Sequence, residues 1–318
     1  MTHVPDINLS SNFSENTAAP RHFTIERVTD PQSLTQEWEP LLHCIFPDEG
    51  DWEPQELLLE RLANGEAFFL MRNEAGEAIG MELSQVVAGS SAMYIPWTGV
   101  LPEYRNLGIG ADMNRTISAY MSDKYGVTHT LLDIEDPARM GDAGYSAEEL
   151  QEAAPMAQRR INFWRREGFI IVDDEQAQSG DKLEYARPSS EDEREIQAYD
   201  HMAIRFDLDD PNMRRHMNSD GTAISRDFVR QCYLDMTRIQ YYQNNKMSED
   251  ELRDAFPAVN HYLNNIDLVE SPWLSIHTSA VKPKTSPHVA TTMNMITEES
   301  ANRPTLQAGS PDNVLNPV

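Results

Sequence analysis

The chain has few cysteines and no long apolar run. Only two of its 318 residues are cysteines, Cys44 and Cys232, and neither lies in a CxxC pair or near a cluster of histidines. A disulfide framework needs more than this, so we expect two small apolar side chains in a reducing compartment. No apolar stretch approaches the ~20 residues that span a bilayer. Because the first residues also lack a secretory signal, we expect a cytoplasmic protein without a membrane partner.

Positive charge is scarce as well, since 26 Lys and Arg stand against 52 Asp and Glu and the net charge is −26. An acidic surface repels phosphate backbones, so no nucleic-acid partner is expected. Such a surface can attract a cationic amine, although an excess of acid also serves solubility alone. The sequence contains no HExxH motif, cysteine cluster or EF-hand spacing, and no metal is expected.

Composition divides the chain into four parts. Residues 1–20 are polar and aperiodic, which predicts a flexible arm, and residues 277–318 are rich in Ser, Thr, Pro and Asn, which predicts a disordered tail. Residues 21–210 alternate between strand-like and helix-like segments and are expected to form one α/β domain. Residues 211–276 predict a helical extension packed on that domain.

Hydrophobic periodicity and end signals locate the individual elements. Helices are predicted at 33–46, 54–66, 109–124, 156–168, 224–243 and 248–263, the last opening with a Ser248–Glu251 capping box. Strands are predicted at 22–30, 91–100, 129–136, 169–174, 182–188 and 201–210, with a hairpin over 67–87. The strand, helix and strand between residues 91 and 136 follow one another as in a βαβ unit.

The stretch GVLPEYRNLGIGADMNR (99–115) places Gly108 and Gly110 where a strand-like run gives way to a helix. Glycine destabilises a helix interior but lets the backbone approach another group closely. A helix start presents unpaired N–H groups and a partial positive charge, which favour an anion. The pattern therefore predicts a phosphate-binding turn. A dinucleotide-binding GxGxxG is excluded by Met113 at the third glycine position, and a Walker loop by the lack of GK[ST].

The turn belongs to a longer pattern, V-x-P-x-Y-R followed by R-x-x-G-x-G/A. It is formed by Val100, Pro102, Tyr104, Arg105, Gly108, Gly110 and Ala111. This pattern resembles the coenzyme-A signature of the GNAT N-acetyltransferase superfamily. NFWRREGF (162–169) resembles a second stretch of that family, with Trp164 where the family has a tyrosine. The resemblance covers about residues 22–210 and implies a GNAT-like fold, with a mixed, mostly antiparallel central sheet flanked by helices, and acetyl-CoA as acyl donor.

The resemblance also implies how coenzyme A is held. The backbone at Val100 and Leu101 would pair with the pantetheine as another strand does. The pyrophosphate would lie against the turn, where Arg105 is placed for a charge-assisted contact. Trp164 would lie beside the acyl chain. The backbone N–H groups at the phosphates would come from Asn106, Leu107, Gly108, Ile109, Gly110 and Ala111.

Transfer of an acetyl group to an amine needs a base that removes a proton from the amine. The strand 91–100 contains no acid, so the candidates are Glu135, then Glu82, and Asp133, which shares a strand face with Glu135. The family commonly has a tyrosine that protonates the thiolate, and Trp164 cannot replace it because an indole N–H is not acidic. Tyr185 or Tyr145 is the remaining candidate, or else solvent supplies that proton.

Two functions of different classes fit these patterns. The first is an N-acyltransferase that transfers acetyl from acetyl-CoA to a primary amine by direct attack in a ternary complex, since neither cysteine has the surroundings of an acyl-enzyme nucleophile. The second is a weakly active or inactive acyl-CoA-binding module with a regulatory or scaffold role. An RNA-acetylating activity conflicts with the net charge. The apolar faces in 211–276 fit three roles: lining an acceptor groove, forming a homodimer interface, or packing in the core.

Overall fold

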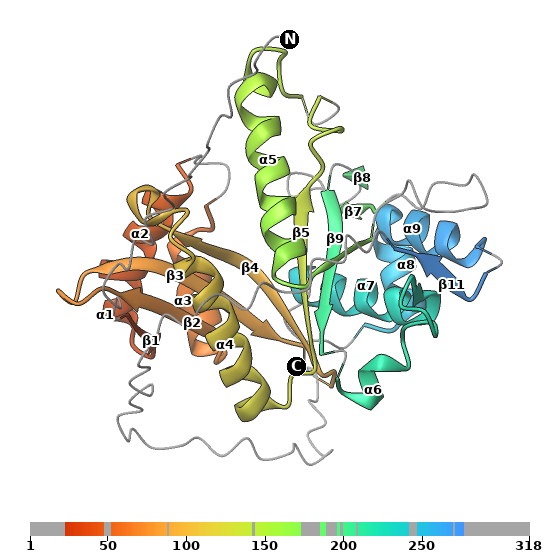
Figure 1. Cartoon of the computed structure of the whole chain (residues 1–318), viewed down its shortest axis with the longest axis horizontal. Helices are drawn as coiled ribbons and strands as arrows, with labels where there is room; N and C mark the ends of the chain where they lie inside the picture. The colour runs from red at the N-terminus through yellow and green to blue at the C-terminus, as the bar shows by residue number, and fades with distance from the viewer. Residues whose placement is uncertain are drawn as a thin grey trace, which may run out of the picture.

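The structure is a computed structural model, and it describes residues 23–47, 52–87, 89–141, 144–172, 185–188, 196–197, 200–207, 209–241, 247–269 and 271–276. The predicted arm (1–20) and the predicted tail (277–318) therefore lie outside the described residues, as do residues 182–184 of the strand predicted at 182–188. The described chain folds around one large sheet that has helices on both faces (Figure 1).

The large sheet has seven strands in the order β1-β2-β3-β4-β5-β9-β6. Every neighbouring pair is antiparallel except β4 and β5, which run parallel. The expected mixed, mostly antiparallel sheet is thus confirmed. Its strands are β1 (Thr24–Val28), β2 (Ala67–Arg72), β3 (Ala78–Val86), β4 (Ala92–Val100), β5 (His129–Glu135), β6 (Ile170–Val172) and β9 (Asp200–Phe206).

Two short strand pairs lie outside the large sheet. β7 (Arg187–Pro188) pairs with β8 (Ile196–Gln197), and β10 (Ala223–Ser225) pairs with β11 (Trp273–Ser275). The helices are α1 (Pro31–Ser33), α2 (Glu39–Ile45), α3 (Gln55–Ala63), α4 (Ile109–Tyr125), α5 (Glu149–Arg166), α6 (Pro211–Arg214), α7 (Arg226–Tyr241), α8 (Glu249–Ala255) and α9 (Pro257–Asp267). A π-helical turn, η1 (Leu34–Trp38), joins α1 to α2, and a 3-10 turn, η3 (Pro102–Tyr104), follows β4. Within the described residues no helix is long and apolar enough to cross a membrane.

Alternation along the central strands assigns the helices to the two faces. Met93 and Ile95 of β4 pack against α4, and Leu132 and Ile134 of β5 pack against α5. The residues between them, such as Tyr94 of β4, pack in the cluster that contains α7. Figure 1 shows the same division, with α4 and α5 in front of the sheet and α7 behind β9. Helices α1 to α3 cover the half of the sheet formed by β1 to β4, on the face opposite α4.

Two predicted helices have different bounds in the structure. The helix predicted at 248–263 is two helices, because Pro257 lacks the N–H that would continue α8 and instead occupies the first turn of α9. The helix predicted from residue 156 begins earlier, at Glu149, and continues through Pro155. The Ser248–Glu251 capping box is confirmed, with both reciprocal hydrogen bonds formed.

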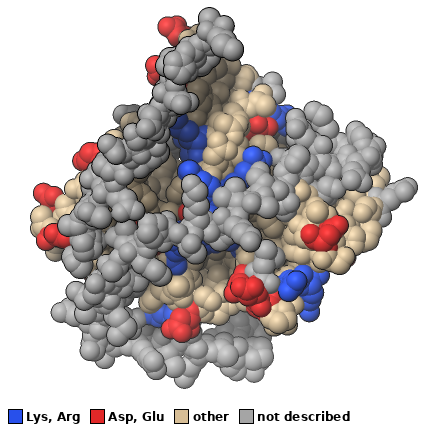
Figure 2. Space-filling view, in the orientation of Figure 1, with Lys and Arg blue, Asp and Glu red and all other residues tan. Residues whose placement is uncertain are grey.

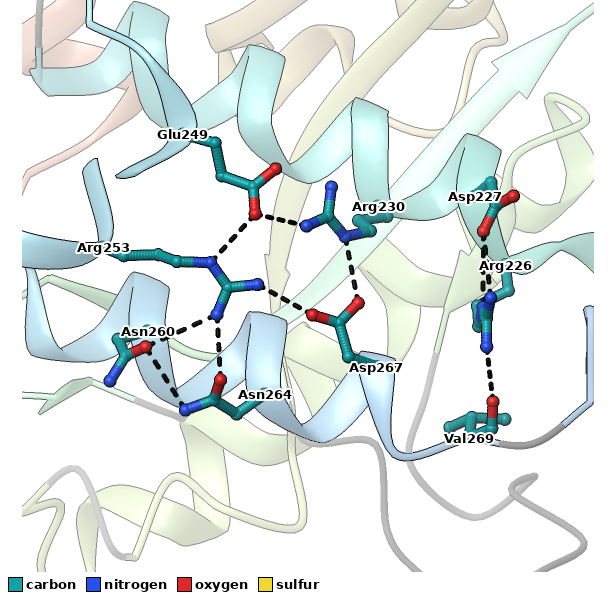
Figure 3. Close-up of polar contacts among 9 residues, drawn as sticks. All are labelled: Arg226, Asp227, Arg230, Glu249, Arg253, Asn260, Asn264, Asp267 and Val269. Atoms are coloured by element: carbon teal, nitrogen blue, oxygen red, sulfur yellow. Dashed lines mark hydrogen bonds and ion pairs between the residues drawn. The ribbon is translucent and has the colours of Figure 1, made fainter. Parts of the chain in front are cut away.

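Helices α7, α8 and α9 are tied together by a network of charged groups (Figure 3). Glu249 of α8 accepts from Arg230 of α7 and from Arg253 on its own helix, the latter at 2.9 Å. Asp267 of α9 accepts from the same two arginines, at 3.1 Å and 2.8 Å. Because each carboxylate bridges both guanidinium groups, the network fixes the three helices relative to one another more firmly than separate surface pairs would.

The core of these helices is continuous with the core of the sheet. Phe256, Tyr262 and Leu263 are almost fully buried and belong to the same cluster as Leu131 of β5 and Ile204 of β9. We therefore expect the sheet and the three helices to unfold together. A single cooperative transition is the physical consequence of one contiguous core.

Replacement of the Phe256 ring tests this continuity. Phe256→Ala should lower the free energy of unfolding by about 3–5 kcal/mol, because it removes a fully buried ring and leaves a cavity. Denaturant unfolding should still show one transition, followed alike by far-ultraviolet circular dichroism and by tryptophan fluorescence. Leu268→Ala is the control, since Leu268 is 72% exposed. Two separate transitions, with only one of them shifted, would show that α7 to α9 form an independent unit.

Candidate functional site

Strands β4 and β5 pair over only three residues and then separate. The ladder joins Ala92, Met93 and Tyr94 to His129, Thr130 and Leu131, whereas β4 continues to Val100 and β5 to Glu135. Beyond the ladder β4 stays paired with β3 and β5 stays paired with β9. The two strands therefore form a wedge that opens toward their carboxyl ends, and the backbone of β4 is left there without a strand partner on one side. We call this opening the β4–β5 wedge.

An irregularity in β4 lies at the start of the wedge. Gln85 of β3 is opposite Tyr94 and Leu83 is opposite Trp97, so Ser84 faces two residues, Ile95 and Pro96. This is the two-against-one count of a β-bulge, which bends a strand away from its neighbour. Pro96 also has no N–H to give to a ladder. The bulge accounts for the point at which β4 leaves β5.

The wall of the wedge formed by β4 leads directly to the predicted phosphate-binding turn. After η3 the chain turns through Asn106 and Gly108, both with positive φ (64° and 82°), and α4 begins at Ile109. In the described chain no side chain caps this helix, and the N–H groups of Ala111 and Asp112 already bond to Gly108 O. The start of a 17-residue helix is thus open at the end of the wedge, which is a suitable place for a phosphate.

The two glycines of the turn have different roles. Gly108 has a backbone that side chains rarely adopt, and an added Cβ would point into open space. At Gly110 a Cβ would lie 3.8 Å from Val100, which is ordinary contact with the protein. The backbone conformation itself favours glycine only at Gly108, whereas the need for glycine at Gly110, to let a phosphate come close, stays a prediction.

The side chains of the turn leave its backbone accessible. Ile109 and Ala111 are buried, so their side chains do not cover the turn, and the N–H of Ala111 is already bonded to Gly108 O. Leu107 is 45% exposed. The exposed Arg105 donates to the carbonyl oxygens of Val100 and Ile45, each at 3.4 Å, and its charge thereby stays beside the end of β4. Val100 and Leu101 are partly buried against the core clusters.

Glu82 is the only acid of β3 and is completely buried beside the wedge, on the α4 side of the sheet. One carboxylate oxygen accepts from Ser84 at 2.9 Å, and the other accepts from Thr98 at 3.0 Å and Asn114 at 3.2 Å. Burial raises the pKa of Glu82 from 4.5 to about 7, against the effect of these three donors. Glu82 is therefore poised to hold or release a proton near neutral pH, one strand away from the wedge.

The neighbours of Glu82 include a partly buried arginine that sequence reasoning did not find. Arg205 of β9 donates to Asn114 at 2.7 Å and to Ser118, both on α4. Its guanidinium also lies over the ring of Phe169, 4.7 Å from the centroid. Since Asn114 bonds to both Glu82 and Arg205, a polar chain runs beneath α4 from β3 to β9. An arginine within a strand of apolar residues was the available signal.

Asp133 lies on the opposite face of the sheet, at the bottom of the wedge. Its carboxylate accepts from the hydroxyl of Tyr94 at 2.7 Å and from the amide of Gln240 at 2.9 Å. The same Gln240 amide lies 2.7 Å from the Tyr94 oxygen. Tyr94 and Gln240 were not among the sequence candidates. The available signal for Tyr94 was its place two residues before Pro96, which disrupts the strand.

Glu135 was the preferred base in the sequence analysis. It is the last residue of β5, its side chain is 40% exposed, and it forms an ion pair with Arg160 of α5. Its part as the base remains a prediction. The pairing with β9 is regular through Glu135, so Asp133 and Glu135 do share a strand face.

The aromatic candidates lie in apolar surroundings. Trp164 is buried and packs edge-on against Phe163 and Phe169, each 4.9 Å away between ring centroids. Tyr185 is buried with its ring 5.9 Å from Tyr233 and 6.1 Å from Tyr262, in the cluster of α7 and α9. Tyr145 is exposed in the segment before α5. Their predicted parts in acyl binding and proton transfer therefore remain predictions.

The distribution of charge on the α4 and α5 face is uneven. Figure 2 shows Lys and Arg side chains gathered in the middle of this face, around α5, whereas Asp and Glu side chains lie mostly toward its edge. In a chain with a net charge of −26, this gathering provides a local positive field. Among the described residues no group of three or more His, Cys, Asp or Glu side chains is arranged to hold a metal ion.

Comparison with solved structures gives likenesses of low sequence identity and low TM-score. The chain resembles a GNAT acetyltransferase from Elizabethkingia anophelis with acetyl-CoA bound, at 14% identity and a TM-score of 0.37, over 58% of this chain and 98% of that one. It resembles the ribosomal-protein-S18-alanine N-acetyltransferase of Escherichia coli at 13% identity and a TM-score of 0.37, over 58% and 93%. It also resembles a variant of the spermidine N-acetyltransferase from Vibrio cholerae at 9% identity and a TM-score of 0.37, over 58% of this chain and 94% of that one.

The strand order and the mostly antiparallel pairing are those that the resemblance implied. No family model and no curated protein matches the chain. Likenesses this weak carry no chemistry, so what the site can do has to be argued from the wedge, the open helix start, the buried Glu82 and the partly buried Asp133.

The pH dependence of stability tests the state of Glu82. Its pKa is higher in the folded chain than the ordinary value of 4.5, so folding binds a proton between pH 4.5 and 7 and stability falls as pH rises through that window. Glu82→Gln removes this ionisation. The variant should gain stability relative to wild type from pH 4.5 upward, by on the order of 3 kcal/mol, and the gain should level off above pH 7.

The measurement is the free energy of unfolding from pH 4 to 8, with Glu103→Gln as the control at an exposed acid. The control should keep the wild-type pH dependence. A difference between Glu82→Gln and wild type that stays constant from pH 5 to 7 would mean that folding does not raise the pKa of Glu82 and that its carboxylate is already ionised at pH 5.

Proposed function

We propose that the chain is an N-acyltransferase that takes an acyl group from acyl-CoA, in the first place acetyl-CoA, and transfers it to a primary amine. One observation carries the proposal: the unpaired edge of β4 in the wedge ends at the uncapped, glycine-containing start of α4. A strand edge recognises an extended chain of amides, and a helix start recognises phosphate. Coenzyme A combines the two groups in that order, from pantetheine to pyrophosphate.

Different residues from Val100 to Gly110 would bind different parts of coenzyme A. The backbone at Val100 and Leu101 would pair with the pantetheine amides, and the N–H groups from Leu107 to Gly110 would face the pyrophosphate. Arg105 stands between the two and supplies positive charge at the end of β4. The positive field around α5 would add a longer-range attraction that is screened by salt.

The acyl group would then lie in the wedge, with Glu82 and Asp133 on its two faces. Direct attack by the amine on the thioester carbonyl needs no acyl-enzyme. Burial raises the pKa of the Cys232 thiol far above its usual range, which keeps it unreactive. Asp133 is only partly buried and is in reach of an amine that enters the wedge, whereas every described contact of Glu82 seals it inside the protein.

A second function, a coenzyme-A-binding module without turnover, is favoured by two observations. Glu82 is fully enclosed, and the family's tyrosine position holds Trp164, which is buried among rings. Such a module would bind acyl-CoA at the same turn but release no thiol with any amine. Binding and turnover measured on one preparation separate the two functions.

Substitution of Gly108 tests the binding site. Gly108→Ala places a Cβ in the open space over the turn and strains the backbone, so the affinity for coenzyme A should fall at least tenfold in titration calorimetry. Gly126→Ala is a matched control, because Gly126 also has a positive φ (70°), has open space around its Cβ position and caps the other end of the same helix.

The control should lose stability to a similar extent but keep its affinity for coenzyme A within about twofold. Equal loss of affinity in the two variants would show that strain in α4, rather than contact at Gly108, is responsible. Wild-type protein that does not bind coenzyme A or acetyl-CoA would contradict the proposed function.

A further inference from the structure

The described contacts of the wedge include one side chain from outside the predicted 21–210 domain. Gln240 lies in the last turn of α7, 107 residues after Asp133, and its amide reaches both Asp133 and Tyr94. These three residues come from three elements: β4, β5 and the helical extension. We call them the Tyr94–Asp133–Gln240 cluster.

With Asp133 ionised, the donor and acceptor of each hydrogen bond in the cluster can be assigned in one way. An ionised carboxylate can only accept, so Asp133 takes one hydrogen bond from the Tyr94 hydroxyl and one from the Gln240 amide nitrogen. The second hydrogen of that amide then faces the Tyr94 oxygen at 2.7 Å. Gln240 therefore contacts both partners and helps to fix their positions.

The cluster lies where the chemistry would take place. Tyr94 is the last residue of β4 paired with β5, opposite Leu131, and Asp133 is two residues farther along β5 on the same face. The bond between Tyr94 and Asp133 thus spans the narrow end of the wedge. It does so on the face opposite α4 and α5, which α7 covers, so an acceptor would reach Asp133 through the wedge.

Helix α7 is held firmly enough to position Gln240. Ser90, in the turn between β3 and β4, donates to Asp235 of α7 at 2.8 Å and so ties the helix to the sheet. Val229 and Tyr233 of α7 are almost fully buried in the cluster that also contains Tyr94. The charged network of Figure 3 then joins α7 to α8 and α9.

We propose that Gln240 is a positioning residue of the acyl-transfer site and that the Tyr94–Asp133–Gln240 cluster receives the cationic amine acceptor. This inference rests on the proposed function. Asp133 attracts the ammonium group of the acceptor and takes one of its protons, which leaves a neutral amine. The amine lone pair attacks the thioester carbon, and the carbon–sulfur bond breaks with its electron pair on sulfur. The second proton of the nitrogen ends on sulfur, and the proton on Asp133 passes to solvent.

The role of Gln240 follows from this sequence. Without its amide, the Asp133 carboxylate and the Tyr94 hydroxyl lose the donor that fixes their geometry, and a displacement of about 1 Å can reduce a rate by as much as 10²-fold. The extension would therefore be needed for turnover and not for binding of coenzyme A, which lies against the turn before α4.

Matched substitutions on α7 test the inference. Gln240→Ala and Gln240→Glu are compared with Gln231→Ala and Gln231→Glu, because Gln231 lies on the same helix and donates to another carboxylate, Asp235, at 2.7 Å. Tyr94→Phe keeps the buried ring and removes the hydroxyl. Each variant is assayed for thiol release from acetyl-CoA with spermidine, a lysine-containing peptide and a peptide with a free N-terminus, for its Kd for coenzyme A and for its Tm.

The expected pattern separates catalysis from folding. Gln240→Ala should lower kcat about tenfold and Gln240→Glu more than tenfold, because a second carboxylate faces Asp133, while the Kd for coenzyme A changes less than twofold. Tyr94→Phe should resemble Gln240→Ala. Both Gln231 variants should keep kcat within twofold even where Tm falls. If Gln240 had only a structural role, the Gln240 variants would likewise lower Tm and leave kcat within twofold.

Unchanged kcat in Gln240→Ala and Gln240→Glu would overturn the inference. Wild-type protein that binds coenzyme A but releases no thiol with any amine of the panel would also overturn it, since the cluster would then have no cationic acceptor. Wild-type protein that does not bind coenzyme A would instead contradict the proposed function.

Discussion

The separation of β4 from β5 after three residue pairs is the constraint on which the site depends. A parallel ladder carried to the end of both strands would satisfy the backbone of β4 and leave no space in the sheet. The bulge at Ile95 and Pro96 ends that ladder, so the edge of β4 is free and continues into the turn before α4. The open helix start, the buried Glu82 and the partly buried Asp133 matter chemically only because they surround this wedge.

The two faces of the wedge are built for different tasks. On the α4 side, the polar chain from Glu82 through Asn114 to Arg205 holds α4 against the sheet and keeps a buried acid beside β4. On the other side, helices that follow the main sheet in sequence contribute Gln240 and cover Tyr94. The extension is thereby more than an addition to the core, since it completes the polar surroundings of Asp133.

The local parts of this structure could be predicted from the sequence, and the long-range parts could not. The turn at Gly108, the helix after it and the capping box at Ser248 follow from patterns within a few residues. The choice among Glu82, Asp133 and Glu135 depends on burial and on partners far along the chain, such as Arg160 for Glu135. The residues next to Gln240 and Arg205 in the sequence do not indicate their partners, because those partners lie far along the chain and come close only in the folded structure.

Hydrogen exchange tests the central claim that the wedge and the start of α4 bind coenzyme A. Backbone amides of residues 97–101 and 107–110 should exchange more slowly when coenzyme A is added, since the ligand would pair with the edge of β4 and accept from the helix start. Amides at the far end of α4, around Gly126, should exchange as before. Protection that is absent from both segments, or confined to another part of the chain, would contradict the account.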